Sequence, residues 1–196
     1  MKMKKLVALN GVRAMAFAAA GLVALGVPLT ATAADKFEKF EKFENFVAAF
    51  QVIEILDSNV DSSCLPTSPG TDSTAMGRIS GSGMGTGGIG AFTLSSVDCV
   101  RAANPYFQPP YTFSSKLLKL TTSNSDEIVA TYRGTAEIDP VTFLLVLNGT
   151  FEFTGGTGKY QKIRGGGRIA GAENISTFPS TRGYVTLIGS IARPLD

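Results

Sequence analysis

Few side chains in this chain could do acid–base or nucleophilic chemistry, and histidine is not among them. The sequence has no histidine and only two cysteines, Cys64 and Cys99. A serine or cysteine nucleophile activated by histidine is therefore excluded, as is a histidine-containing metal site. Carboxylates, tyrosines, lysines and arginines remain as possible acids and bases. We expect no bound metal.

Four carboxylates are candidate acid or base groups: Asp98, Asp126, Glu137 and Asp139. Each of them also fits a solvated carboxylate at a strand edge or turn, and this is the interpretation that we favour. Tyr132 is the one titratable side chain on an expected inner face of the central strands. It is therefore the best candidate for a buried catalytic group.

Two glycine-rich segments match nucleotide-binding loops only in part. Residues 83–88 fit G-x-G-x-x-G, but the following residues 91–94 are typical of a strand rather than of a pyrophosphate-binding helix. Residues 155–159 read GGTGK, but Tyr160 stands where a phosphate loop needs serine or threonine. The glycines of this segment instead predict a structural turn formed by Gly155, Gly156 and Gly158. No cofactor is expected.

Residues 1–33 have the organisation of a secretory signal peptide. Basic residues come first, an uncharged apolar stretch covers 14–29, and Ala31-Thr32-Ala33 is a small-x-small cleavage site. The apolar stretch is shorter than the roughly 20 residues that a membrane-spanning helix needs. We expect a secreted bacterial protein, periplasmic or extracellular, with no integral membrane segment after cleavage.

Cleavage would change the charge balance. The full chain has 18 basic and 16 acidic residues, and residues 1–33 contain four of the basic ones and none of the acidic ones. The remainder therefore has 14 basic and 16 acidic residues. This is not the strongly basic balance of a nucleic-acid-binding protein, so no nucleic-acid partner is expected.

The two cysteines of an exported protein would meet an oxidising compartment. A disulfide between Cys64 and Cys99 would stabilise the fold by about 3–4 kcal/mol in the loop-entropy model. Two free thiols are the alternative, and we predict the disulfide.

Residues 34–50 are expected to form a charged arm before the folded domain. Residues 35–45 read DKFEKFEKFEN, which repeats a Lys-Phe-Glu triplet. A spacing of three drifts around an α-helix, although lysine and glutamate favour that conformation. We predict a helical or disordered arm, which could also mediate self-association.

Apolar residues that alternate with polar ones predict strands throughout the expected domain, residues 51–196. The clearest segments are 52–56, 112–121, 127–138, 141–153, 164–172 and 184–192, with two more around a glycine turn in 75–97. About eight short strands predict an all-β barrel or sandwich. One face of each strand is expected to be buried, and this interior is expected to be apolar without converging charges. Tyr106, Phe107 and Tyr111 lie in a proline-aromatic loop that could contact a ligand or simply pack on the barrel.

The run from Phe153 to Tyr160, with Ile163 and residues 165–167, resembles the glycine-rich stretch of dirigent proteins and allene oxide cyclase-like barrels. The resemblance covers about residues 74–192. It implies a single antiparallel eight-stranded barrel of calycin-like type, often trimeric. Plant members guide radical coupling or cyclise a fatty-acid epoxide, but no polar catalytic residue is carried over to this chain.

These observations predict a secreted β-barrel that acts as a binding or structural module, and any ligand is expected to be small, apolar and held in the interior. One alternative is a cyclase or isomerase acting on a hydrophobic small molecule. Another is a self-assembling envelope or matrix protein that associates through the Lys-Phe-Glu arm.

Overall fold

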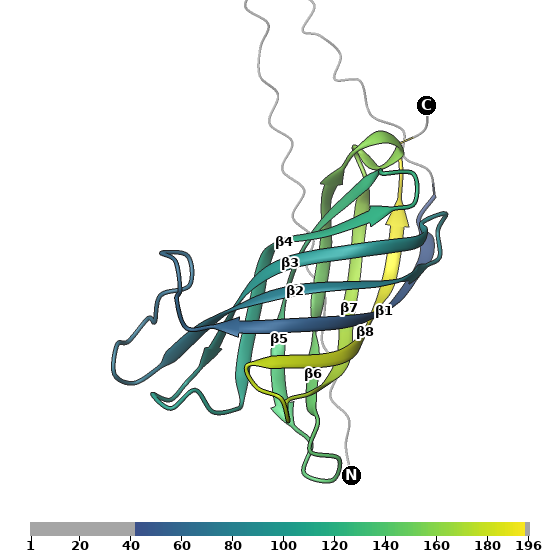
Figure 1. Ribbon diagram of the computed structural model, residues 1–196. Helices are drawn as coiled ribbons and strands as arrows, with labels where there is room; N and C mark the ends of the chain where they lie inside the picture. The colour runs from purple at the N-terminus through teal and green to yellow at the C-terminus, as the bar shows by residue number, and fades with distance from the viewer. Residues whose placement is uncertain (1–41, 195–196) are drawn as a thin grey trace, which may run out of the picture. The chain divides into compact units, whose positions relative to one another are not determined.

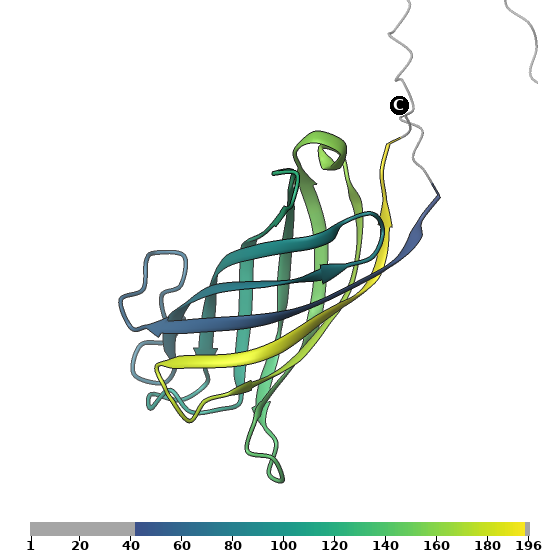
Figure 2. The same ribbon diagram turned by 45° about the vertical axis from the view of Figure 1, so that its right-hand side comes forward.

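The computed structural model describes residues 42–194, which form a closed antiparallel barrel (Figure 1). Its strands are β1 (Glu44–Asp57), β2 (Ser73–Gly85), β3 (Gly90–Ala102), β4 (Tyr111–Thr122), β5 (Glu127–Ile138), β6 (Leu145–Gly156), β7 (Arg164–Asn174) and β8 (Ser180–Ala192). Each strand pairs with its neighbours in sequence, and β8 closes the barrel against β1 (Figure 2). The expected eight-stranded antiparallel barrel is confirmed. Within the described range the one helical element is a 3-10 turn, η1 (Gly158–Tyr160).

Side chains alternate between the interior and the solvent along the strands. In β1, Phe46, Ala48, Phe50 and Val52 are buried, and the residues between them are exposed. The inner faces expected for residues 127–138 and 184–192 are confirmed by the same alternation in β5 and β8. Because successive side chains of a strand point to opposite faces, the strands direct apolar side chains into a common core, although the glycine-rich strands β2 and β7 contribute few of them.

The N-terminal boundary of the domain differs from the prediction. Residues 44–50 belong to β1 and are neither a helix nor a tail. Phe46 and Phe50 are buried, while Phe43 is 56% exposed. From Phe46 onward the alternation of buried and exposed residues makes this segment a strand. The three-residue repeat does not continue into β1. The signal peptide and residues 34–41 of the arm lie outside the described residues.

The start of β6 also differs from the prediction, because residues 141–144 form a turn. Val141 and Phe143 are 82% and 73% exposed, and the strand begins at Leu145. Asp139 Oδ1 accepts the backbone N–H groups of Val141 and Thr142, both at 2.8 Å. These hydrogen bonds hold the chain in the turn and lower the pKa of Asp139.

The two ends of the barrel differ in their connections. The connections at the long-loop end are residues 58–72, 103–110, 139–144 and 175–179. Those at the short-turn end are residues 86–89, 123–126 and 157–163. Figure 1 shows η1 folded over the short-turn end, at the top of the view, and the longer loops at the lower left.

Aromatic side chains fill the short-turn end. The fully buried Phe46 ring lies 5.2 Å from the Phe153 ring and 5.9 Å from the Phe151 ring, centroid to centroid. Tyr160, also fully buried, reaches from η1 and donates its hydroxyl to the Gly88 carbonyl at 3.0 Å. Edge-to-face rings and a satisfied hydroxyl pack this end closed.

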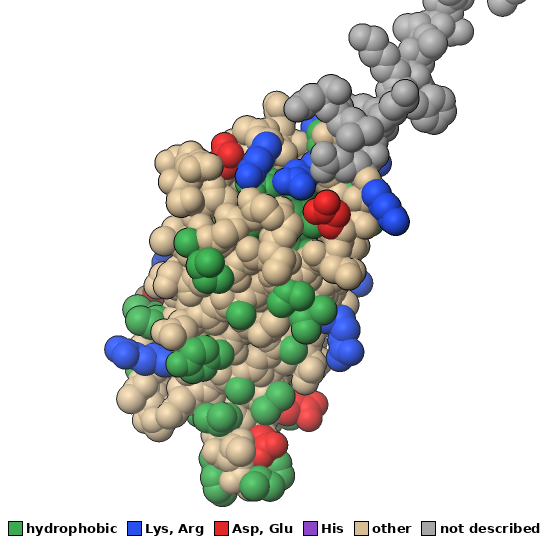
Figure 3. Space-filling view, turned by 90° about the vertical axis from the view of Figure 1, so that its right-hand side faces the viewer, with side chains coloured by type: hydrophobic (Ala, Val, Ile, Leu, Met, Phe, Trp, Pro, Cys, Tyr) green, Lys and Arg blue, Asp and Glu red, His purple; other side chains and the backbone are tan. Residues whose placement is uncertain are grey.

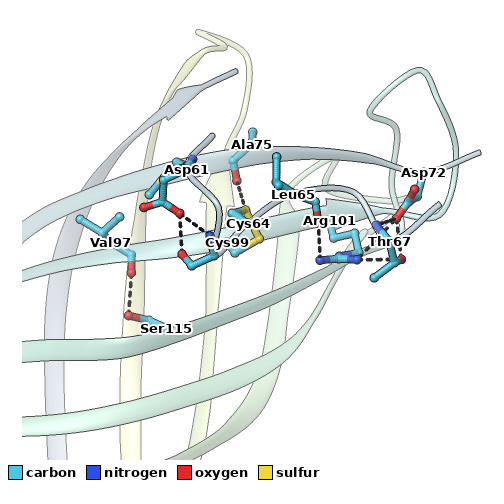
Figure 4. The surroundings of a disulfide bond; sticks show 12 residues. Asp61, Cys64, Leu65, Thr67, Asp72, Ala75, Val97, Cys99, Arg101 and Ser115 are labelled. Atoms are coloured by element: carbon cyan, nitrogen blue, oxygen red, sulfur yellow. Dashed lines mark hydrogen bonds and ion pairs between the residues drawn. A yellow bond between two sulfur atoms is a disulfide. The ribbon is translucent and has the colours of Figure 1, made fainter. Parts of the chain in front are cut away.

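A disulfide fixes the longest loop to the barrel wall, as predicted. Cys64 in the loop and Cys99 in β3 are bonded, with their Cα atoms 5.3 Å apart (Figure 4). Arg101, two residues further along β3, donates to Thr67 Oγ1 at 2.8 Å and to the Leu65 carbonyl at 3.2 Å. The loop between β1 and β2 is therefore held at two points beside the long-loop end.

Some large apolar side chains lie on the outside of the barrel. On the face shown in Figure 3 they form small groups between polar atoms, and charged side chains lie mostly towards the margins. No helix within residues 42–194 has the length and apolar character to cross a membrane.

Candidate functional site

A cavity of about 80 Å³ lies inside the barrel, in the half nearer the long-loop end. Most of its wall is apolar and comes from inward-facing residues such as Phe50, Val52, Leu94, Phe113, Leu118, Ile169 and Val185. Residues from strand ends and loops surround it towards the rim: Leu56, Tyr111, Leu147, Ile175 and Phe178. Since the other end is packed closed, the site is a pocket within the barrel rather than a channel.

Carboxylates converge on this cavity, contrary to the expectation of an interior without charges. Glu54 of β1, Asp98 of β3 and Glu173 of β7 are only 6%, 5% and 3% exposed, and all three line the cavity. We call them the acidic cluster. Glu54 follows Val52 on the inner face of β1, and Asp98 occupies the corresponding inner position of β3. The expected solvated position of Asp98 is therefore wrong.

Glycines in neighbouring strands make room for these carboxyl groups. Gly77 of β2 lies directly opposite Asp98, and a Cβ at this position would overlap both Glu54 Oε1 and Asp98 Oδ1. Gly183 of β8 lies opposite Glu173 and is similarly crowded by its side chain. The absence of a side chain at Gly77 brings two carboxyl oxygens together in the space where a Cβ would stand.

Tyr132 and Thr181 donate hydrogen bonds to two of the carboxylates. The Tyr132 hydroxyl, on the inner face of β5, donates to Asp98 Oδ2 at 3.2 Å. Thr181 Oγ1 donates to Glu173 Oε2 at 2.6 Å. The inner position expected for Tyr132 is thus found, and its hydroxyl contacts a carboxylate that the sequence did not place beside it.

Two serines support Tyr132 where the strand register shifts. The pairing of β3 with β4 shifts next to Ser96, and that of β4 with β5 shifts next to Ser115. Ser115 Oγ donates to the Val97 carbonyl at 2.7 Å and accepts the Leu117 N–H at 3.1 Å. Ser96 Oγ lies 3.0 Å from both Ser115 Oγ and Tyr132 Oη. The serines satisfy backbone groups freed by the bulge and hold the tyrosine in place.

Two oxygens of the cluster have no hydrogen-bond donor among the described residues. They are Glu54 Oε1 and Asp98 Oδ1, the pair that lies over Gly77. Of the described residues that line the cavity, none is lysine or arginine. Adjacent buried carboxylates without a cation strongly favour binding of a proton between them.

Burial and mutual repulsion shift the pKa values in the direction that this geometry requires. Burial raises the pKa of Asp98 to about 7, and the Glu173 charge acts in the same direction, although the Tyr132 hydrogen bond opposes it. Burial and then the Asp98 and Glu173 charges raise the pKa of Glu54 well above its ordinary value. Burial, followed by the nearby Asp98 charge, also raises the pKa of the Tyr132 hydroxyl.

The other carboxylates named from the sequence lie away from the cavity. Glu137 points outward from β5, and Asp139 belongs to the turn before β6. Asp126 precedes β5 at the short-turn end, where its carboxyl group occupies the space that a Cβ at position 158 would need. Of the four acid or base candidates, only Asp98 reaches the interior.

The proline-aromatic loop contributes one residue to the cavity wall. Tyr111 lines the cavity, and its ring lies 5.1 Å from that of Phe107, whose carbonyl accepts the Tyr111 hydroxyl hydrogen at 3.1 Å. Tyr106 is 78% exposed. Phe107 and Tyr111 form a packed pair at the rim, while Tyr106 does not contact the cavity.

The predicted glycine turn lies at the opposite end of the barrel. Gly155 and Gly156 end β6, and Gly158 opens η1 with a φ of 54°. This segment therefore takes no part in the cavity.

Together, fold and site define a closed antiparallel barrel with an internal pocket that joins an apolar wall to an acidic cluster. No family model matches the chain, and no curated protein matches it either. Among the described residues, no group of three or more histidine, cysteine, aspartate or glutamate side chains is arranged to hold a metal ion.

Proposed function

We propose that this protein is an exported β-barrel that binds one small, mainly apolar molecule in its interior. The single observation that carries the proposal is the apolar cavity, which is open towards the long loops and closed at the other end. Eight-stranded barrels have interiors of the size that holds one small ligand, and ligand sites commonly lie in barrel mouths. The Cys64–Cys99 disulfide is compatible with export into an oxidising compartment.

The size of the cavity limits the ligand. Roughly 10–15 Å³ of cavity volume, measured as the space open to the centre of a water-sized sphere, accommodates one water molecule. A cavity of 80 Å³ therefore has room for on the order of five to eight water-sized groups. A compact ring or a short chain fits this space. A long fatty-acid chain, of the kind implied by the allene oxide cyclase resemblance, would need to extend past the rim.

Native mass spectrometry of the mature protein from an exporting host tests this proposal. We expect an adduct of on the order of a hundred daltons, matching the cavity, that is lost in Ala136→Leu. Ala136 lines the cavity, so the larger side chain fills it. Ala91→Leu, on the outer face of β3, is the control and should retain the adduct. A bare protein mass, or an adduct that survives Ala136→Leu, would contradict binding inside the barrel.

A second candidate function is acid–base catalysis on the bound molecule, as in a cyclase or isomerase. The observation that favours it is the contact of Tyr132 with Asp98, beside Glu54. When two carboxyl groups share a proton, one can accept a proton from a carbon atom while the other supplies a proton to a neighbouring position. A neutral acid in an apolar site can also stabilise a developing enolate by hydrogen bonding.

Isomerisation of 3-cyclohexenone to its conjugated isomer, followed by ultraviolet absorbance, tests the catalytic candidate. The reaction only moves a proton between carbon atoms, and the substrate is small enough for the cavity. We expect Asp98→Asn to slow turnover by about 10²–10⁴-fold, the usual contribution of a positioned acid or base, and Tyr132→Phe to slow it as well, because the Tyr132 hydroxyl positions Asp98. Turnover equal to that in buffer alone, or unchanged in Tyr132→Phe, would remove this candidate.

A further inference from the structure

The acidic cluster has a charge that the apolar part of a ligand cannot balance. Glu54, Asp98 and Glu173 come from three different strands and meet in an interior that is otherwise apolar. Removing carboxylates from water costs several kcal/mol each unless they are paired or protonated. A bound proton or a bound cation is therefore needed to neutralise part of the negative charge of the acidic cluster.

The hydrogen-bonding capacity of the cluster is also incomplete. Tyr132 satisfies Asp98 Oδ2, and Thr181 satisfies Glu173 Oε2. Glu54 Oε1 and Asp98 Oδ1 have no donor within residues 42–194, although both side chains are more than nine-tenths buried. Buried polar atoms of folded proteins nearly always have a partner. A proton shared between these two adjacent oxygens would satisfy both of them, and so would a donor group of a bound ligand.

We propose that the pocket binds a small apolar amine, whose ammonium group lies between Glu54 and Asp98 in place of the proton that they share. An ammonium group supplies both a positive charge and several N–H donors. The rest of the ligand would contact the apolar wall, where the rings of Phe50 and Phe113 offer faces that also attract cations. This inference rests on the proposed function, since it names the ligand class for the same pocket.

An organic cation fits this site better than a metal ion or a neutral ligand. The carboxylates of the described chain are not arranged as a metal-binding group. A neutral hydroxyl could donate one hydrogen bond but carries no charge, so the carboxyl pair would have to keep its shared proton.

The surroundings of the cluster determine how binding depends on pH. β1, β3, β5 and β7 supply Glu54, Asp98, Tyr132 and Glu173, and β2 supplies Gly77, which does not titrate. β4 supplies the hydroxyl of Ser115 and, in the same cavity, the titratable Tyr111, and β8 supplies the hydroxyl of Thr181. Since no basic side chain lines the cavity, an entering ammonium group must displace a proton from the carboxyl pair. Binding should therefore release about one proton per ligand near neutral pH.

Isothermal titration calorimetry with benzylamine and benzyl alcohol tests the inference. The two probes have the same size and ring, but only benzylamine is cationic near neutral pH. We expect benzylamine to bind at least about 10-fold more tightly, consistent with charge-assisted hydrogen bonds. Titrations in two buffers of different ionisation enthalpy should show proton release for benzylamine and none for benzyl alcohol.

Variants of the carboxyl pair separate this inference from the proposed function. Asp98→Asn should remove most of the preference for benzylamine while benzyl alcohol still binds, and Glu54→Gln should do the same. Glu137→Gln, on the outer face of β5, is the matched control and should behave like the unchanged protein. Equal binding of both probes, or amine binding without proton release, would overturn the ammonium site but leave the apolar pocket intact. Binding of neither probe would overturn both proposals.

Discussion

Replacing Phe46 by alanine is expected to lower the free energy of unfolding by about 3–5 kcal/mol, the usual cost of removing a buried aromatic ring. Phe46 is fully buried and contacts the rings of Phe151 and Phe153 on β6. The interior cannot collapse easily around the lost ring, because Tyr160 and its hydrogen bond to Gly88 hold the neighbouring turn in place. Equilibrium unfolding in urea, followed by far-ultraviolet circular dichroism, measures the change.

Phe43→Ala provides the matched control from the same series of phenylalanines. Phe43 is 56% exposed, so its replacement should change the free energy of unfolding by less than about 0.5 kcal/mol. The contrast between the two variants follows from the strand conformation at the start of β1. Equal and small effects of both substitutions would show that the barrel does not begin at Glu44.

The second large effect is expected from the pH dependence of stability. The pKa of Asp98 rises from 3.8 to about 7 in the folded state, so the folded protein retains a proton that the unfolded chain releases in this range. Stability should therefore be greatest near pH 4 and fall as the pH rises to about 7. One proton corresponds to about 1.4 kcal/mol per pH unit, which gives a loss of about 4 kcal/mol over the window. The raised pKa of Glu54 acts in the same direction.

Asp98→Asn should remove much of this loss and stabilise the protein at pH 8. The asparagine has the same shape, can accept the Tyr132 hydrogen bond and can donate its amide to Glu54 Oε1, which otherwise has no donor in the described chain. Urea unfolding at pH 5, 6, 7 and 8 measures how steeply the free energy of unfolding falls with pH. The carboxylates outside the cavity with lowered pKa values, Asp61, Asp72 and Asp139, are ionised in both states over this range and do not contribute.

Glu137→Gln is the control for the loss of a carboxylate as such, because Glu137 lies on the outer face of β5. It should leave the slope unchanged. A protein whose stability does not fall between pH 5 and pH 8, or an Asp98→Asn variant that retains the full slope, would show that the buried pair is not protonated as we infer.

Local sequence patterns predicted the class of fold because burial on one face imposes a period of two on a strand. The alternation around Tyr132 in β5 and around Leu187 in β8 identified the inner faces correctly. The cysteines could be paired from the chemistry of an oxidising compartment alone, and the Cys64–Cys99 disulfide is present. The predicted start of the barrel was wrong because the charged Lys-Phe-Glu triplets before Phe46 favour a helix, and this signal competed with the two-residue alternation of the strand. The predicted start of β6 was wrong because the Asp139 side chain accepts two backbone N–H groups and holds residues 141–144 in a turn.

The acidic cluster could be anticipated only in part from the sequence. Glu54 follows Val52 by two residues in an apolar alternation, and Asp98 precedes Val100 by two residues. The period of two therefore places both carboxylates on inner faces, but the general tendency of carboxylates to be exposed led us to predict a solvated Asp98. Glu173 had the same signal relative to Ile169.

The sequence by itself determined the strands, their inner faces and the pairing of the cysteines, because these depend on local periodicity and on the chemistry of single residue types. The tertiary structure alone decided that Glu54, Asp98 and Glu173 meet. They belong to three strands far apart in the chain, and their approach depends on barrel closure, which brings β1 beside β8, and on Gly77, which leaves space for two carboxyl oxygens. Closure is a property of the whole sheet, because the tilt and stagger of all eight strands must agree before β8 can pair with β1.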